Sequence, residues 1–236
     1  MLILKKNGEQ NFVNDLYLHF KNRAKPIIVF DIGANVGEYT EILLSESNNQ
    51  NVEIELHLFE PTKSCFSILS EKFGGLKNIK LNNFGVSDSE CTLPIYYDKD
   101  RSGLASLYQR DLKSYNIKMN ISEEIDLKRI DNYIINNEIN HIDFVKIDIE
   151  GHELKAFEGF GQYLNNNFID FIQFEYGGAN IDSRTYLKDF FNLFDNHGFH
   201  ITKIMRNHLE KNEYHPSLEN FIYSNFVAIS NLINLK

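Results

Sequence analysis

Residues 26–40 read PIIVFDIGANVGEYT, and this stretch is the clearest indicator of the fold. Its first part is an apolar run, which is typical of a strand buried on both faces of a parallel sheet. Its second part holds Gly33 and Gly37, which permit a tight turn into a following helix. Because similar apolar runs alternate with helix-period segments, we expect an α/β protein with a mostly parallel sheet and helices on both faces.

The expected elements extend along the whole chain. Further strands are predicted at residues 54–59, 79–84, 92–97, 142–147, 168–174, 200–205 and 222–229. Helices are predicted at residues 10–23, 36–46, 62–73, 153–163 and 184–197. We expect one domain over residues 1–236, with a helical extension at 1–25. Residues 98–124 interrupt the β/α alternation and are expected to form an insertion near the substrate site.

The composition indicates a folded, soluble protein. Hydrophobic residues make up 42% of the 236 residues, and 33 acidic against 24 basic residues give a net charge of −9. No basic stripe is present, so nucleic-acid binding is disfavoured. Two cysteines, Cys65 and Cys91, indicate neither a disulfide framework nor a thiolate zinc site. The short apolar run before Lys5 is not a secretion signal, and no later run reaches the roughly eighteen residues of a membrane span, so we expect a cytoplasmic protein.

In an open parallel sheet, ligands bind beyond the carboxyl ends of the strands. The first such position holds Asp31, Gly33, Asn35 and Gly37, where the backbone can approach a ligand and the helix start attracts an anion. Because Asn35 and Glu38 stand where a dinucleotide fingerprint requires glycines, a nicotinamide or flavin cofactor is disfavoured. A tight connection without any ligand is the alternative.

The next two strand ends are also polar. Glu60 follows the second strand, where a carboxylate can accept both hydroxyls of a ribose. Ser87 and Asp88 follow the third strand, where an adenine edge would lie if the ribose contacts Glu60. For Glu60 or Asp88 alone, a helix cap or a solvated loop acid is the alternative.

Residues 142–153 read IDFVKIDIEGHE, which is the most specific element of the chain. Alternation along a strand places Lys146, Asp148 and Glu150 on one side. Charges at this spacing carry a desolvation cost near the end of a central strand, so they face either a ligand or one another. A buried structural pair between Lys146 and an acid is the alternative. Glu175 ends a later strand in the same way.

The order of VFDIGANVG, FEP, NFGVSD and FVKIDIEGHE over residues 26–178 resembles FkbM-type S-adenosylmethionine-dependent methyltransferases. The resemblance implies a Rossmann-like class I methyltransferase sheet of seven strands, with an antiparallel last strand at 222–229. It also implies O-methylation of a hydroxyl on a sugar, glycan precursor or related small molecule. The implied cofactor-binding residues are Asp31, Gly33, Asn35, Gly37, Glu60, Ser87, Asp88 and Asp148.

An alcohol is a poor nucleophile, so we expect a base near the acceptor. The candidates are His152, Asp148 and Glu150, although His152 can also be read as an exposed residue at a helix start. Asp148, His152 and Glu175 could converge on a divalent ion, which we do not favour. The competing functions are a non-catalytic cofactor-binding scaffold and a Rossmann-type oxidoreductase. We expect residues 102–108 to be a lid or an ordered loop, and residues 208–215 to be a solvated loop without a metal.

Overall fold

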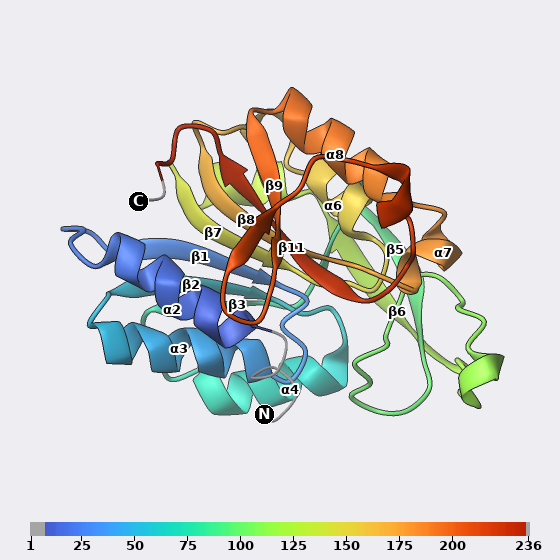
Figure 1. Ribbon diagram of the computed structural model, residues 1–236. Coiled ribbons are helices and arrows are strands. Elements are labelled where there is room, and N and C mark those ends of the chain that lie inside the picture. Colours follow the sequence, from blue (N-terminus) through green and yellow to red (C-terminus); the bar gives the residue numbers. More distant parts are fainter. Residues whose placement is uncertain (1–7, 235–236) are drawn as a thin grey trace.

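The computed structural model describes residues 8–234 and contains a central eight-stranded sheet (Figure 1). The strand order is β10-β9-β11-β8-β7-β1-β2-β3. The strands are β1 (Ile27–Ile32), β2 (Ile54–Phe59), β3 (Ile79–Asn82), β7 (Ile142–Ile147), β8 (Ile169–Tyr176), β9 (Phe199–Ile204), β10 (Leu209–Lys211) and β11 (Ser224–Ser230).

The expected class I topology is confirmed. Strands β1, β2, β3, β7 and β8 are parallel, and β11 is antiparallel to both β8 and β9. The expected count of seven strands was one too low. Residues 208–215 were expected to be a solvated loop, but Leu209–Lys211 within them form the edge strand β10, which pairs antiparallel with β9. Three residues are too few for a period-2 pattern to be recognised in a sequence.

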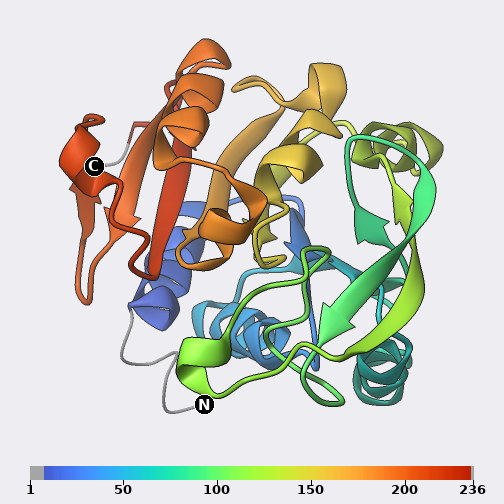
Figure 2. The same ribbon diagram turned by 90° about the vertical axis from the view of Figure 1, so that its right-hand side faces the viewer.

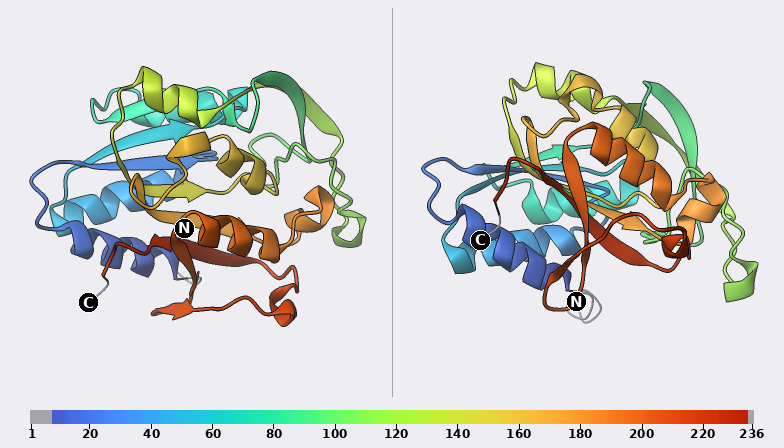
Figure 3. Two further views of the ribbon diagram at one scale, coloured as in Figure 1. Left: turned by 90° about the horizontal axis from the view of Figure 1, so that it is seen from above. Right: turned by 45° about the horizontal axis from the view of Figure 1, so that its top comes forward.

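Helices cover both faces of the sheet and enclose two hydrophobic cores. The helices are α2 (Glu9–Phe20), α3 (Glu38–Gln50), α4 (Lys63–Phe73), α5 (Ile130–Asn136), α6 (Glu153–Glu158), α7 (Ala179–Ser183) and α8 (Leu187–Asn196). One core joins α2, α3 and α4 to the sheet, and the other joins α5, α6 and α8 to its opposite face. The right-hand view of Figure 3 shows the blue helices α2 and α3 below the sheet and the orange α8 above it.

Three short helices complete the fold, at η1 (Lys113–Tyr115), η2 (Gly161–Tyr163) and η3 (Pro216–Leu218). The expected helix at 153–163 is therefore α6 followed by η2, and α5 was not expected from the sequence. Residues 1–7, which include the run used to argue against a secretion signal, lie outside the described part of the chain. Within residues 8–234, no helix is both long enough and apolar enough to span a bilayer.

A second, three-stranded sheet stands beside the first (Figure 2). Its order is β4 (Gly85–Val86), β6 (Ile121–Lys128) and β5 (Cys91–Tyr97). The expected strand at 92–97 therefore lies outside the main sheet. The stretch 98–124 was read as irregular, but its end forms the start of β6. Side chains of β6 alternate, so that Ile125 and Leu127 turn inward and pack on Ile95.

Candidate functional site

A cavity of about 680 Å³ lies at the carboxyl ends of the central strands. Its walls come from the turn after β1, the ends of β2 and β7, the small sheet, and the segment 98–120 between β5 and β6. The strand order changes direction between β1 and β7, since β2 follows β1 on one side and β7 flanks it on the other. The cavity therefore occupies the position where open α/β sheets bind their ligands.

The turn after β1 packs tightly against the protein itself. Gly33 has φ +82°, and a Cβ at this position would lie 2.0 Å from the carbonyl oxygen of Asp148. Gly37 has φ +86°, and its Cβ would lie 2.5 Å from the ring of Phe73. Asn35 also adopts a left-handed conformation, at φ +48°. Both glycines are thus required by packing, whether or not a ligand is bound.

Glu60 joins the first turn to the start of α4. Its Oε2 accepts a hydrogen bond from the backbone N–H of Asn35 at 2.9 Å. Its Oε1 accepts from the N–H of Thr62 at 2.9 Å and from the Thr62 hydroxyl at 2.6 Å. The side chain lines the cavity, and burial raises its pKa. Because a carboxylate oxygen has more than one lone pair, Glu60 keeps acceptor capacity for a ligand.

Asp31 is fully buried and is absent from the cavity wall. Its Oδ2 accepts a hydrogen bond from the Thr40 hydroxyl at 2.7 Å, and Nζ of Lys146 lies 3.7 Å from its Oδ1. Lys146 also donates to the carbonyl of Gly33 at 3.4 Å and lies 3.5 Å from Asp148. Burial alone would lower the pKa of Lys146, but the carboxylates of Asp148 and Asp31 outweigh burial, so the pKa lies above its usual value. The ammonium thus joins the ends of β1 and β7.

Three carboxylates meet at the ends of β7 and β8. Asp148, Glu150 and Glu175 each have an oxygen within 4.8 Å of the others. His152 is not part of this group, so the convergence of Asp148, His152 and Glu175, which the sequence analysis did not favour, is not the arrangement found in the described residues. Burial, together with Asp148, raises the pKa of Glu150 to about 8 and that of Glu175 to about 11.

His152 lines the cavity and is held at both ring nitrogens. Nε2 lies 2.9 Å from the hydroxyl of Ser87, and Nδ1 lies 3.1 Å from the hydroxyl of Tyr108. Burial lowers the pKa of His152 to about 4, so the ring is neutral at pH 7. His152 does stand at the start of a helix, as the N-cap of α6, but it is half-buried in this contact rather than exposed.

Ser87 and Asp88 are placed outside the cavity wall. Ser87 is buried against His152, and the Asp88 carboxylate accepts a hydrogen bond from Lys155 at 2.9 Å. The wall on this side is apolar instead. It is formed by Phe84, Gly85, Val86, Ile95, Ile125 and Leu127.

Several residues of the cavity wall were not predicted from the sequence. Glu9 of α2 and Tyr223, just before β11, both line the cavity. Glu9 accepts a hydrogen bond from Gln173 Nε2 at 2.7 Å, and Gln173 Oε1 accepts one from the Tyr39 hydroxyl at 2.6 Å. These residues come from distant parts of the chain, and only the folded sheet brings them together.

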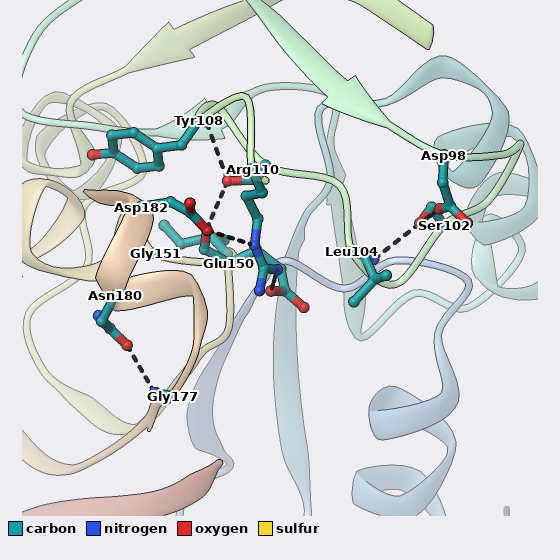
Figure 4. A network of polar contacts seen from close by, with 12 residues as sticks. Asp98, Ser102, Leu104, Tyr108, Arg110, Glu150, Gly151, Gly177, Asn180 and Asp182 are labelled. Carbon is teal, nitrogen blue, oxygen red and sulfur yellow. Dashed lines mark hydrogen bonds and ion pairs between the residues drawn. The ribbon is translucent and has the colours of Figure 1, made fainter. Parts of the chain in front are cut away.

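The segment 98–120 reaches the first turn. The side-chain amide of Asn35 donates through Nδ2 to the backbone carbonyl of Ser102 at 3.1 Å. The Ser102 hydroxyl donates to Asp98 at 2.5 Å and accepts from the N–H of Leu104 at 3.0 Å (Figure 4). These bonds make residues 98–104 an ordered loop beside the cavity.

Comparisons with known proteins agree with this geometry. The model of the methyltransferase FkbM domain matches residues 31–211. Methyltransferase sdnD of Sordaria araneosa is 24% identical over 162 residues, which cover 58% of this chain and 61% of that protein. The solved methyltransferase FkbM from Methylobacillus flagellatus KT has a TM-score of 0.53 and 15% identity, and it covers 91% of this chain.

The chain spans only part of these relatives, since its match covers 61% of the fungal protein and 47% of the solved chain. At 15% identity, the structural likeness establishes the fold alone. The family model extends over most of the chain and includes both the turn after β1 and the end of β7. The resemblance found in the sequence is confirmed, and the chain belongs to the FkbM methyltransferase family.

Proposed function

We propose that the protein is an S-adenosylmethionine-dependent O-methyltransferase whose acceptor is a hydroxyl of a sugar, glycan precursor or related small molecule. The cavity at the change of strand direction carries this proposal, because Glu60, Asp148 and the first turn meet in its wall. Its volume of about 680 Å³ lies within the usual range of roughly 300–1,000 Å³ for small-molecule sites. The cofactor and the reacting part of an acceptor would share this space.

The wall offers a complement to each part of the cofactor. Three of the roughly four acceptor sites of Glu60 are used within the protein, so Oε2 would accept one ribose hydroxyl with its remaining lone pair. The apolar side formed by Phe84, Val86 and Leu127 suits the faces of an adenine ring. In this proposal the apolar wall takes over the adenine contact that the sequence assigned to Ser87 and Asp88.

The amino-acid end would lie over the first turn. The start of α3, a helix of 13 residues, suits a carboxylate. Asp148, whose side chain is 34% exposed, supplies negative charge toward the ammonium and the sulfonium. Asp31 would act indirectly, by holding Lys146 beside Asp148.

When bound, S-adenosylmethionine supplies a methyl group that is already activated on a sulfonium. The protein's residues must align the acceptor oxygen and receive its proton. Glu150 is our first candidate for the base, because its pKa of about 8 lies near a physiological working pH. Asp148 is the second candidate. His152 is neutral but engaged at both nitrogens, which argues for a positioning role.

Binding and turnover test the proposal separately. Calorimetry with S-adenosylhomocysteine and with nicotinamide dinucleotides comes first, and a preference for a dinucleotide would overturn the cofactor assignment. Methyl transfer is then screened against sugars, nucleotide sugars and polyketide alcohols.

Glu150→Gln is expected to lower the turnover number by about 10²- to 10⁴-fold while leaving S-adenosylhomocysteine affinity unchanged. Asp148→Asn tests the second candidate. If the protein binds S-adenosylhomocysteine but transfers no methyl group to any acceptor, it is a cofactor-binding protein without this activity.

A further inference from the structure

The segment 98–120 contacts the turn after β7 through alternate residues. The Ser106 hydroxyl donates to the carbonyl of Glu150 at 2.7 Å, and the Tyr108 hydroxyl lies 3.1 Å from Nδ1 of His152. Arg110 donates from Nη1 to Oε2 of Glu150. Ser106, Tyr108 and Arg110 therefore each contact this turn, and the third of them carries a positive charge.

Arg110 lies between two carboxylates (Figure 4). Its side chain is only 7% exposed and contacts Glu150 through Nη1, while its Nε lies 3.3 Å from Oδ2 of Asp182 in α7. A buried guanidinium that is paired with carboxylates holds them in a fixed geometry, since its donors point in a rigid fork. Arg110 thus connects the segment 98–120, the end of β7 and α7 at one point.

The turn that carries Glu150 is conformationally strained. Glu150 has φ +52°, and Gly151 follows at φ +102° with its Cβ position only 2.9 Å from the carbonyl oxygen of Ala179. Glu153 Oε1 accepts the N–H groups of Ile149 at 3.0 Å and Gly151 at 3.1 Å. Strain of this kind persists where the surroundings over-determine the backbone, and it is concentrated at functional sites.

Negative groups dominate the surroundings of Glu150. Asp148 of the same turn and Glu175 of β8 approach it within 4.8 Å, and Glu153 of α6 raises its pKa further. Asp182 of α7 shares Arg110 with Glu150. Lys146 is engaged with Asp31 and Asp148. Among the described residues, Arg110 is the cation that contacts the Glu150 carboxylate directly.

We propose that Arg110 is a positioning residue of the acceptor site, which favours the ionised form of the Glu150 carboxylate and directs it toward the reacting hydroxyl. Its catalytic consequence rests on the methyltransferase function proposed above. The electrostatic part does not, because the titration of Glu150 can be followed without any acceptor.

The direct test is ¹³C NMR titration of the full chain with labelled glutamate side-chain carboxyl carbons, with Glu150→Gln identifying the resonance. In Arg110→Met, Glu150 faces Asp148 and Glu175 without its cation, so its titration is expected to move up by about one to three pH units. Arg110→Lys retains the charge and is expected to restore most of that shift. Lys113→Met removes an exposed cation of the same segment and should leave Glu150 unaffected.

In turnover assays, the acidic limb of the pH profile of kcat should move up in Arg110→Met, while S-adenosylhomocysteine affinity stays the same. An unchanged Glu150 titration in Arg110→Met would overturn the inference. Should Arg110→Met not fold, Arg110→Lys is read alone. A Glu150 titration and a pH profile like those of wild type support the charge role, and a Glu150 titration that moves up by about one to three pH units would sink it. If the wild type binds no S-adenosylhomocysteine, the proposed function fails, but the NMR result still decides the role of Arg110.

Discussion

The hydroxyl of Ser87 lies 2.9 Å from Nε2 of His152, and this contact changes the expected role of the histidine. Considered from the sequence, His152 was a candidate base with an ordinary pKa near neutrality. In the structure, burial lowers that pKa to about 4, and Tyr108 occupies the other ring nitrogen. The ring joins the end of β4 to the segment 98–120, and a link of this kind stabilises the fold in a pH-dependent way.

His152 is therefore expected to lower stability in acid. Its folded pKa of about 4 lies below the unfolded value of about 6.5, so the unfolded chain binds the proton more readily. The stabilisation is present above pH 6.5 and is lost as the pH falls toward 4. When the pH falls from 7.5 to 5, the free energy of unfolding of wild type should decrease by about 1 to 2 kcal/mol more than that of His152→Gln. Urea unfolding of both proteins at the two pH values measures this difference, and parallel curves would refute it.

The second prediction concerns Glu60. Glu60→Ala removes a buried carboxylate that contacts the first turn and, in our proposal, the ribose. S-adenosylhomocysteine affinity is expected to weaken by about 1 to 3 kcal/mol, because hydrogen bonds to a charged acceptor are lost. Calorimetry measures the change, and circular dichroism confirms that the variant is folded.

Glu55→Gln provides the matched control for Glu60→Ala. Glu55 lies on β2, the strand that Glu60 follows, but its side chain is 37% exposed and lies outside the cavity wall. The affinity of Glu55→Gln for S-adenosylhomocysteine should equal that of wild type. Equal affinities for a folded Glu60→Ala and for Glu55→Gln would remove Glu60 from the cofactor site.

The sequence predicted where β2 and β7 end, because those signals are local. A buried apolar run followed by glycines identifies the turn after β1, and two-residue spacing places Lys146, Asp148 and Glu150 at one strand end. The same reasoning did not show which way Ser87 and Asp88 face. Their direction depends on β4, whose two residues pair with β6 more than thirty positions further along the chain.

Long-range packing explains the other differences. Polar and apolar residues alternate in β6, but the irregular residues that precede this strand hid the pattern in the sequence. No local pattern places Glu9 and Tyr223 at the cavity, or Arg110 beside Glu150. The three residues come from α2, the last loop and an insertion. Their positions follow from the order of the strands, which no short motif encodes.

A third prediction follows from the packing of Gly33. Gly33→Ala places a Cβ 2.0 Å from the Asp148 carbonyl at φ +82°, so the end of β7 must move. The unfavourable backbone conformation alone is expected to lower the free energy of unfolding by about 1 to 3 kcal/mol. Gly103→Ala is the control, since nothing lies within 4 Å of its Cβ, and its stability should stay within about 0.5 kcal/mol of wild type. Denaturant titration measures the free energy of unfolding of both variants. Equal values for Gly33→Ala and Gly103→Ala would contradict the packing argument.

The last prediction concerns the buried ion pair of Lys146 and Asp31. Lys146→Met leaves the carboxylate of Asp31, which is fully buried, without its cation, and is expected to lower the free energy of unfolding by about 3 to 5 kcal/mol. Replacing Asp31 by Asn in the same protein removes the uncompensated charge, so the double variant should be more stable than Lys146→Met. Urea unfolding of wild type, both single variants and the double variant gives the coupling energy of the pair. Additive effects of the two substitutions would show that Lys146 stabilises the end of β1 through Asp148 and the Gly33 carbonyl rather than through Asp31.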